Sequence, residues 1–439
     1  MTSTSFDVVN ALYGEFFERG VRHFFPSSHI EALGRANSNP PVFTFHPRPD
    51  GRLEVQWGGL EYAVHYNGRS LSQDEVRLIA AISNVLAARY RSLFNANANA
   101  TSFGLFQGIP EDHYVSAYLD PTPYVAADAV PSGRDRISDA IEVLRIASLT
   151  TYENRRVSSG VLLLGADPRP RPDGAVPFRS ELTAIKSFHR LSDGLRTMFV
   201  VNPDGSLVDL VDIGDFARAI GGVSLTAPSP AIYHSHALAT VTGGHICLVL
   251  TPNGEIKIWA EGAQQFNFLE GRWRLSEVAE RYRQWARAVG DANLAKLLFT
   301  AALNLAEARR GGIFVVVEDA ASAKQFVSPA DLLLENEPAR GRKDQIQYLL
   351  RYKRILEMSP AILETAAHVD GAIVLDRESN LLAFGAILRH DLTTASESEI
   401  VEGSRTTAAI ESSKFGSVLK ISEDGLVSFY HNRERVWEL

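Results

Sequence analysis

The sequence predicts an α/β domain over the C-terminal third of the chain, preceded by an α+β region and a β-rich region. Two observations support this organisation. Strand-like runs around Asp-Gly or Asn-Gly pairs recur along the whole chain, and such pairs favour β-hairpins because they tolerate positive φ. In the last third, an amphipathic helical pattern leads at once into an all-apolar strand, IFVVVED. This order is expected where helices cover a sheet.

Hairpins and helices can be assigned to particular segments. Helical periodicity covers residues 74–94, 137–152, 276–289 and 293–310, and the last helix is expected to end at Gly311. The segment HVDGAIVLDRESNLLAFGAIL is a further predicted hairpin, because two apolar runs flank a polar turn. The other hairpins are expected in FHPRPDGRLEVQW, MFVVNPDGSLVDLV, ICLVLTPNGEIKIWA and VLKISEDGLVSFY.

These elements divide the chain into three regions. We expect an N-terminal α+β region over residues 1–190, a β-rich middle region over 191–275 and the α/β domain over 276–439. The proline-rich stretch GADPRPRPDGAVP predicts a loop within the first region or at its edge.

Composition excludes several classes of protein. The chain has 439 residues, of which 45% are hydrophobic, so it can bury a sizeable core. Its net charge of −8 gives no electrostatic footprint for wrapping duplex DNA. No apolar run approaches the roughly 18 residues that span a bilayer, and the N-terminus lacks a signal-peptide pattern, so we expect a cytoplasmic protein. The basic stretches EARRGG and PARGRKDQIQYLLRYKR could attract phosphates or form solvated helix faces.

Common catalytic and metal-binding signatures are absent. The sequence contains no P-loop, no dinucleotide-binding glycine motif, no nucleophile elbow and no His-Glu-x-x-His motif. The single cysteine, Cys247, lies in an apolar run and is expected to be a buried, inert thiol. On a strand, His234 and His236 would share a face that His245 could approach. A metal site there is an alternative to the simpler interpretation, which is partly exposed polar strand residues.

Four motifs in the C-terminal third carry chemistry. In order, they are the helix end EARRGG, the trio Asp370-Gly371-Ala372, the stretch GSRTTAA that begins at Gly403, and the turn SEDG that begins at Ser422. Small residues, one cation and two hydroxyls before a helix suit a loop that presents N–H groups to a phosphate. A plain helix N-cap at Thr406 or Thr407 is the alternative.

In this order and approximate spacing, the motifs resemble those of the diadenylate cyclase domain, which is shared with the DNA integrity scanning protein. The resemblance covers about residues 280 to 435. It implies a mixed sheet flanked by helices that joins two ATP molecules into cyclic di-AMP and releases two pyrophosphates. It also implies Mg²⁺ or Mn²⁺ as cofactor, and a homodimer or higher homo-oligomer in which two protomers meet face to face.

The resemblance also implies roles for individual residues. Asp370 would, with the metal, activate the ribose 3′-hydroxyl, and Glu423 would be a further metal contact. Arg405 would act on the phosphates in catalysis. The expected nucleotide-binding residues are Gly371, Ala372, Gly403, Ser404, Thr406 and Thr407.

The sequence departs from the family pattern at two places. Where the family has Arg-His-Arg, this chain has Arg405-Thr406-Thr407, so a cation and a histidine are replaced by hydroxyls. Arg389 or Lys414 could compensate for the lost charge. SEDG is also one residue shorter than the family form. These departures keep open a nucleotide sensor without turnover, or a purely structural partner protein.

The N-terminal region resembles the sensor-type domains that precede such cyclase domains in bacteria. The resemblance rests on the segment RIASLTTYENRRVSSGVLLLG. Within it, TYENRR is either a turn that contacts a ligand or a helix end with solvated charges. We therefore expect a soluble ligand or a protein partner to regulate the C-terminal domain.

Overall fold

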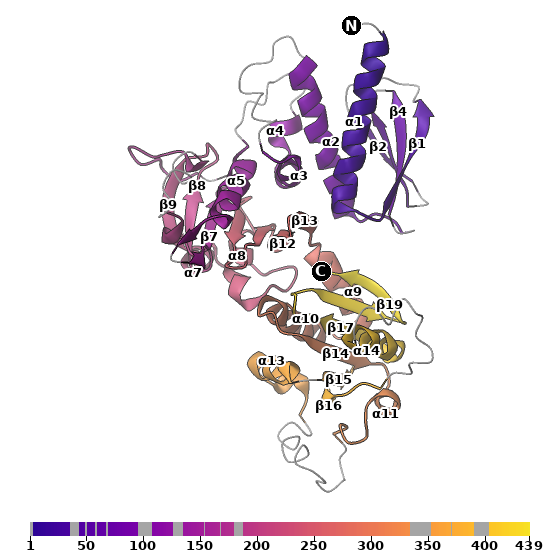
Figure 1. Cartoon of the computed structure of the whole chain (residues 1–439). Helices are drawn as coiled ribbons and strands as arrows, with labels where there is room; N and C mark the ends of the chain where they lie inside the picture. The colour runs from indigo at the N-terminus through magenta and orange to yellow at the C-terminus, as the bar shows by residue number, and fades with distance from the viewer. Residues whose placement is uncertain are drawn as a thin grey trace. The chain divides into compact units, whose positions relative to one another are not determined.

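The computed structural model divides the chain into two compact units (Figure 1). Unit 1 comprises Met1–Ser224 and Ser235–Ser276, and unit 2 comprises Leu225–His234 and Glu277–Leu439. The regions predicted over 1–190 and 191–275 thus lie almost entirely within unit 1. The structure describes residues 3–35, 44–48, 51–57, 59–66, 69–94, 108–125, 135–152, 154–166, 168–179, 188–333, 353–369, 371–389 and 404–439.

Over its described residues, unit 1 contains two sheets of four or more strands, built mainly from hairpins. The larger has seven strands in the order β13-β12-β11-β10-β7-β8-β9, and the smaller has four in the order β1-β4-β3-β2. The predicted Asp-Gly and Asn-Gly hairpins of this unit are confirmed as β2–β3, β8–β9 and β10–β11. The strands are β1 (Ser28–Arg35), β2 (Thr44–Pro47), β3 (Leu53–Trp57), β4 (Leu60–Tyr66), β7 (Ser159–Leu163), β8 (Thr197–Val201), β9 (Leu207–Asp212), β10 (Ile246–Leu250), β11 (Ile256–Ala260), β12 (Ala263–Leu269) and β13 (Arg272–Leu275).

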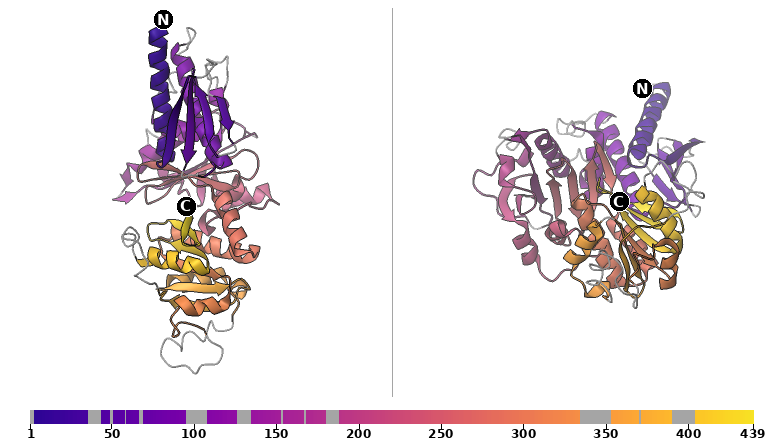
Figure 2. Two further views of the ribbon diagram at one scale, coloured as in Figure 1. Left: turned by 90° about the vertical axis from the view of Figure 1, so that its right-hand side faces the viewer. Right: turned by 60° about the horizontal axis from the view of Figure 1, so that its bottom comes forward.

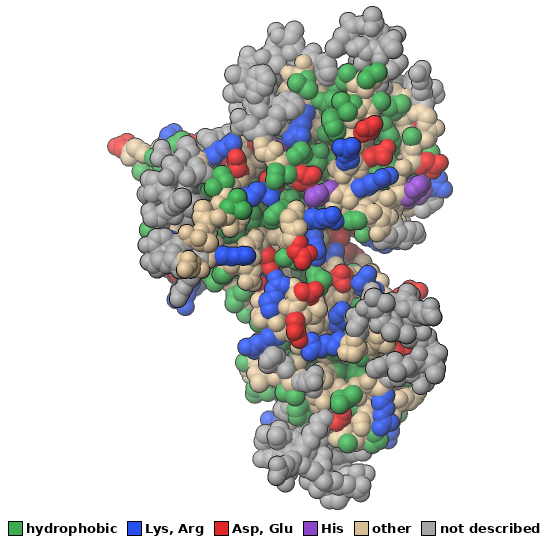
Figure 3. Space-filling view, in the orientation of Figure 1, with side chains coloured by type: hydrophobic (Ala, Val, Ile, Leu, Met, Phe, Trp, Pro, Cys, Tyr) green, Lys and Arg blue, Asp and Glu red, His purple; other side chains and the backbone are tan. Residues whose placement is uncertain are grey.

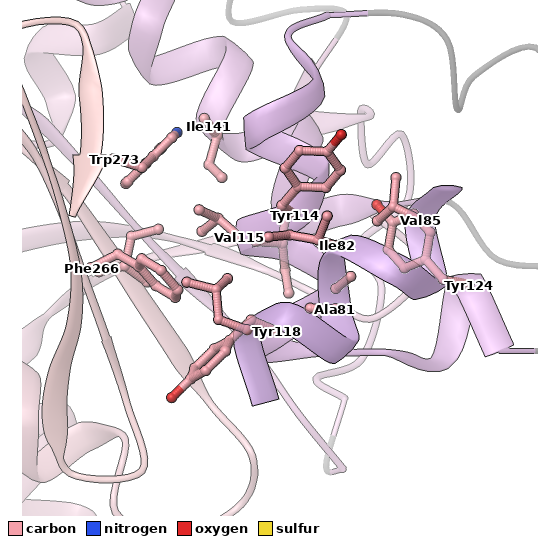
Figure 4. Close-up of a cluster of buried hydrophobic side chains, with 14 of the residues drawn as sticks. Ala81, Ile82, Val85, Tyr114, Val115, Tyr118, Tyr124, Ile141, Phe266 and Trp273 are labelled. Carbon is pink, nitrogen blue, oxygen red and sulfur yellow. The ribbon is translucent and has the colours of Figure 1, made fainter. Parts of the chain in front are cut away.

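Helices pack against these sheets around one hydrophobic core. Figure 4 shows the part where helices meet strands β12 and β13, and the rings of Tyr118 and Phe266 pack edge to face at a centroid distance of 5.0 Å. The helices predicted over 74–94 and 137–152 are confirmed as α2 and α5, although α5 ends at Ser148. Among the described residues, the α-helices of unit 1 are α1 (Ser3–Phe24), α2 (Gln73–Phe94), α3 (Pro110–Leu119), α4 (Thr122–Val125), α5 (Arg136–Ser148), α7 (Ile213–Ile220) and α8 (His234–Ala239), whose first residue belongs to unit 2.

The segment TYENRR, which follows α5, forms a two-residue antiparallel ladder. It pairs β5 (Thr151–Tyr152) with β6 (Arg155–Arg156). It is therefore a short hairpin rather than a helix end. The stretch GADPRPRPDGAVP forms no helix or strand over its described residues, as predicted for a loop.

Unit 2 is a mixed sheet flanked by helices, which confirms the α/β class predicted for this part of the chain. Its six strands follow the order β16-β15-β14-β17-β18-β19, and β14 pairs with β15 in parallel. The strands are β14 (Gly312–Val317), β15 (Ala372–Asp376), β16 (Leu381–Ala386), β17 (Gly416–Ile421), β18 (Val427–His431) and β19 (Glu434–Glu438). The helices are α9 (Val278–Val289), α10 (Ala292–Glu307), α11 (Ala323–Phe326), α13 (Pro360–His368) and α14 (Ser404–Ser412).

Both faces of this sheet are covered, which explains the all-apolar sequence of β14. Phe314 and Val316 pack with α9, α10 and α13. Ile313, Val315 and Val317 pack with α11 and α14 on the opposite face. A strand buried on both faces has no position that favours a polar side chain. The orange and yellow strands of this sheet are seen from two further directions in Figure 2.

Helix α10 ends earlier than predicted, and with a different residue. We expected Gly311 to end it, but Arg309 adopts the left-handed conformation, with φ of 54°. Two backbone bonds close the helix: Arg309 N–H to Ala306 O at 3.1 Å, and Arg310 N–H to Leu305 O at 2.9 Å. This pair of bonds is a Schellman motif, in which glycine usually occupies the left-handed position.

Candidate functional site

Three of the four sequence motifs meet at one edge of the unit 2 sheet. Strands β14 and β15 are parallel and in register, Ile313 opposite Ala372, so EARRGG and Gly371 precede neighbouring strand starts. Strand β17 is antiparallel to β14 and its last residue, Ile421, lies opposite Gly312. The turn SEDG therefore leaves β17 at the same edge, and Figure 1 shows these strands side by side.

Helix α14 brings the fourth motif to this edge. Ala408 and Ala409 of α14 are buried against the sheet with Val418. In the first turn of the helix, Nη1 of Arg405 donates to Oε1 of Glu423 at 2.8 Å. The Arg405 guanidinium also covers Gly311, because a Cβ on that glycine would lie 2.3 Å from Nη1. Arg405 thus contacts two other motifs.

A second arginine joins the same two motifs. The guanidinium of Arg309 lies against Gly425 of the SEDG turn, where a Cβ would come within 2.6 Å of Nη1. Gly425 itself has φ of 90°, which favours glycine. The left-handed conformation of Arg309 and the missing side chain of Gly425 together fix the EARRGG segment against the SEDG turn.

Thr406 has a partner that the sequence did not indicate. Its side chain is buried, and Oγ1 accepts a hydrogen bond of 3.0 Å from Nζ of Lys420 on β17. Lys420 is a half-buried lysine in a run of apolar strand residues, and that interruption is the one signal the sequence carried.

The sequence suggested Arg389 or Lys414 as the cation that replaces the missing charge, but the lysine that contacts Thr406 is Lys420. Lys414 follows α14 at its far end, where Nζ lies 3.7 Å from Glu411 and 4.8 Å from the centre of the Phe415 ring. Its charge is therefore directed to Glu411 rather than to the first turn of α14. The backbone N–H of Arg389 donates a hydrogen bond of 2.7 Å to Phe326 O.

Gly371 and Ala372 have structural reasons for their size. Gly371 has φ of 122°, and a Cβ there would lie 2.3 Å from the carbonyl carbon of Gly385 on β16. Ala372 is fully buried in the apolar core on the α14 face. The absence of a side chain at 371 therefore lets β16 approach β15. The nucleotide contacts expected of these two residues stay predictions.

The structure describes some of the remaining predicted site residues and not others. Ser404 is exposed at the start of α14, and Thr407 is half-buried in the same turn. Glu423 is exposed and directly precedes Asp424 in the turn. Asp370 and Gly403 lie outside the described residues, as does most of the basic segment that begins at Pro338.

Glu423, the one described residue of the predicted metal site, offers oxygen ligands of the kind that a hard divalent cation prefers. Mg²⁺ and Mn²⁺ prefer carboxylate oxygens, and Glu423 exposes 69% of its side chain, so its second oxygen is open to a ligand. Over the described ranges, no group of three His, Cys, Asp or Glu side chains could hold a metal. Asp370 lies outside the described ranges, so a metal held by Asp370 and Glu423 stays a prediction.

His234, His236 and His245 do not share a strand face. The segment predicted as a strand is helix α8, in which residues two apart point in different directions. His236 is buried, with Nε2 at 2.8 Å from Gly194 O, whereas Nδ1 of His245 accepts from Gly165 N–H at 3.0 Å. The strand prediction was wrong because short apolar runs fit both periods. Cys247 is buried as expected, and burial raises the pKa of its thiol.

Burial of His236 predicts an acid-dependent stability of unit 1. Burial lowers the pKa of His236 to about 4, against 6.5 for an exposed histidine. The unfolded chain therefore binds the proton more readily, and stability present above pH 6.5 is lost as the pH falls toward 4. Between pH 7 and pH 5 we expect a loss of about 2 kcal/mol in the free energy of unfolding from this residue.

Urea denaturation at both pH values checks this expectation, with His236→Gln as the matched variant. The glutamine amide can still donate to Gly194 O but does not titrate. The pH-dependent loss should be about 2 kcal/mol smaller in the variant. An identical pH dependence in both proteins would contradict the expectation.

Two general features concern the surface charge and the length and polarity of the helices. On the face shown in Figure 3, Lys and Arg side chains are interspersed with Asp and Glu side chains. Within the described ranges, every helix is too short or too polar to cross a bilayer.

Comparisons with known proteins give little further information. A scan of protein-family models finds no match, and a search of curated proteins finds none either. Among solved structures, the chain is similar to a hypothetical membrane spanning protein from Bacillus cereus, at 18% identity and a TM-score of 0.26. That match covers 35% of this chain and 69% of the other. A TM-score this low carries no argument about fold or function.

Proposed function

We propose that unit 2 is a diadenylate cyclase, which binds ATP at this sheet edge and condenses two ATP molecules into cyclic di-AMP, under the control of unit 1. The observation that carries the proposal is the position of Arg405. From the first turn of α14 it contacts Glu423 and covers Gly311, so three sequence motifs that are far apart in the chain meet at one place. Segments far apart in the chain thus present a cation and a carboxylate at one solvent-exposed place, where both are accessible to a ligand.

The proposed reaction is two phosphoryl transfers. In each, the ribose 3′-oxygen of one ATP forms a bond to the α-phosphorus of the other, the bond from that phosphorus to the bridging oxygen breaks, and pyrophosphate leaves. The 3′-hydroxyl proton is lost at each step. Two protomers facing one another would hold the two nucleotides, because each ATP must be both nucleophile and electrophile.

The side chains at the edge match this chemistry. Phosphoryl transfer depends on positioning and on neutralising phosphate charge, and Arg405 can form charge-assisted bonds to phosphate oxygens. Asp370 and Glu423 would hold Mg²⁺ or Mn²⁺, which would favour loss of the hydroxyl proton. The pair of Arg405 and Glu423 is exposed, at 44% and 69% of its side chains. Such a pair contributes at most about 1 kcal/mol, so a nucleotide can open it at little cost.

A second candidate is a nucleotide sensor that binds ATP or cyclic di-AMP without turnover. Thr406 and Thr407 favour it, because hydroxyls stand where the family has a histidine and an arginine. Loss of one charge-assisted contact in the transition state is enough to lower the rate by about 10- to 100-fold.

Mass spectrometry of the products distinguishes these candidates. Full-length protein is incubated with ATP and Mg²⁺ or Mn²⁺ over a range of protein concentrations. We expect cyclic di-AMP with two pyrophosphates for each product, and a rate that rises faster than linearly with protein where dimers are scarce. The cyclase proposal is wrong if no cyclic dinucleotide forms with either metal at any concentration.

Calorimetry tests the second candidate on the same protein. Binding of ATP or cyclic di-AMP without any product would favour the sensor. If neither nucleotide binds, both candidates are rejected.

A further inference from the structure

Lys420 interrupts the apolar face that β17 presents to α14. Val418, two residues earlier on the same face, is fully buried beneath that helix, whereas Leu419 and Ile421 point to the opposite face. Alternation along the strand therefore places the Lys420 side chain on the α14 face, at the end of β17. Its ammonium reaches the first turn of α14, as the 3.0 Å bond to Thr406 Oγ1 shows.

The register places Lys420 in line with Ala372. Lys420 lies opposite Ile313 on β14, and Ile313 lies opposite Ala372 on β15. These directly paired residues point to the same face of the sheet. Because neighbouring strands are about 4.8 Å apart, Lys420 and Ala372 are separated by roughly 10 Å along this row. At the sheet edge where the motifs meet, one row of paired residues thus contains Ala372 on β15, which follows Gly371, and the cation Lys420 on β17.

The charge of Lys420 is not neutralised by a neighbouring acid within the described ranges. Its partner there is the neutral Thr406 hydroxyl. Ser428, which lies opposite Lys420 on β18, donates its hydroxyl hydrogen to Glu438 at 3.0 Å. Lys420 is half-buried, and an ammonium that is partly withdrawn from water is stabilised by an anionic partner. A phosphate oxygen would supply the missing anion.

We propose that Lys420, together with the Thr406 hydroxyl that it contacts, binds a phosphate group of the nucleoside triphosphate. This inference rests on the proposed function and assigns it a cation that the altered Arg-Thr-Thr motif lacks. Arg405 and Lys420 then approach the phosphates from two elements, the first turn of α14 and the end of β17. Thr406 replaces the larger side chain of the family motif and leaves room for the lysine.

Binding measurements on full-length protein test this assignment. Affinities for ATP, adenosine and inorganic tripolyphosphate are measured by calorimetry for wild type, Lys420→Met and Lys420→Arg. Methionine keeps an apolar stem of similar size without the charge. We expect Lys420→Met to lower the affinities for ATP and tripolyphosphate about 10- to 100-fold and to leave the affinity for adenosine unchanged. Lys420→Arg should restore most of the affinity.

Lys414→Met is the matched control. It removes a lysine charge from the same helix layer, but one that faces Glu411. Its affinity for ATP should equal that of wild type, and the melting temperature of each variant is recorded to separate binding from folding.

The outcomes separate this inference from the proposed function. Equal ATP affinities of wild type and Lys420→Met, or a parallel loss of adenosine binding, would overturn the role of Lys420 and leave the cyclase proposal standing. Lys420-dependent tripolyphosphate binding without cyclic dinucleotide formation would reject the cyclase and support the phosphate site. Wild type that binds neither ATP nor tripolyphosphate overturns both.

Discussion

Replacement of Asp370 by asparagine is expected to lower the rate of cyclic di-AMP formation by about 100- to 10,000-fold. The amide cannot accept the 3′-hydroxyl proton and is a poorer ligand for Mg²⁺ or Mn²⁺ than a carboxylate. Asparagine has nearly the same shape, so the melting temperature should change little. The rate is followed by mass spectrometry of the product, and the affinity for ATP by calorimetry.

Glu378→Gln is the matched control for this substitution. Glu378 is an exposed carboxylate in the turn of the same hairpin, at the opposite end of β15. The same loss of charge there should leave turnover unchanged. Turnover by Asp370→Asn at the rate of the control would show that Asp370 has no part in the chemistry, whereas a large fall in melting temperature would assign Asp370 a structural role.

Replacement of the next residue, Gly371, by alanine is expected to act on stability instead. Its φ of 122° is unfavourable for any L-residue, and its Cβ would lie 2.3 Å from backbone atoms of β16 that cannot move aside alone. We expect unit 2 to lose at least about 3 kcal/mol in its free energy of unfolding. Hydrogen exchange of β15 and β16 amides in increasing urea reports this loss for unit 2.

Gly290→Ala separates the two causes. Gly290, at the end of α9, also has positive φ, 85°, but open space surrounds its Cβ position. That variant should lose only about 1 kcal/mol, the cost of the left-handed backbone. Equal losses at the two positions would mean that β16 moves aside. A stable Gly371→Ala protein with weakened ATP binding would instead support the nucleotide role predicted for this glycine.

Local signals in the sequence predicted helices α2, α5, α9 and α10 and the strands of five hairpins, but not helices such as α1, α3 and α13. Asp-Gly and Asn-Gly pairs predicted the hairpins because the turn conformation depends on a few adjacent residues. The helical period from Asn293 onward predicted α10, and the apolar run after it predicted β14. The errors fell where local signals conflict. The α8 segment is too short to separate the two periods. The left-handed residue that closes α10 is Arg309, although Gly311 is the better helix terminator by propensity.

Contacts between residues on different strands and helices could not be predicted without the tertiary structure. The sequence supplied the order of four motifs and named Arg405, Thr406 and Glu423, but not that Arg405 meets both Glu423 and Gly311. It also missed Lys420, which in the sequence is one lysine in a strand. The register of β17 against β14 and the placement of α14 over that face bring its ammonium to Thr406.

The sequence by itself determined the α/β class of unit 2, its hairpins and the chemical types of the candidate site residues. These follow from turn preferences and from hydrophobic periods within a few residues. Only the tertiary structure decided which side chains meet and why Gly371 must be glycine. The physical reason is that strand register and helix packing join residues distant in the chain, and a backbone contact such as that of Gly371 with Gly385 leaves no trace in local patterns.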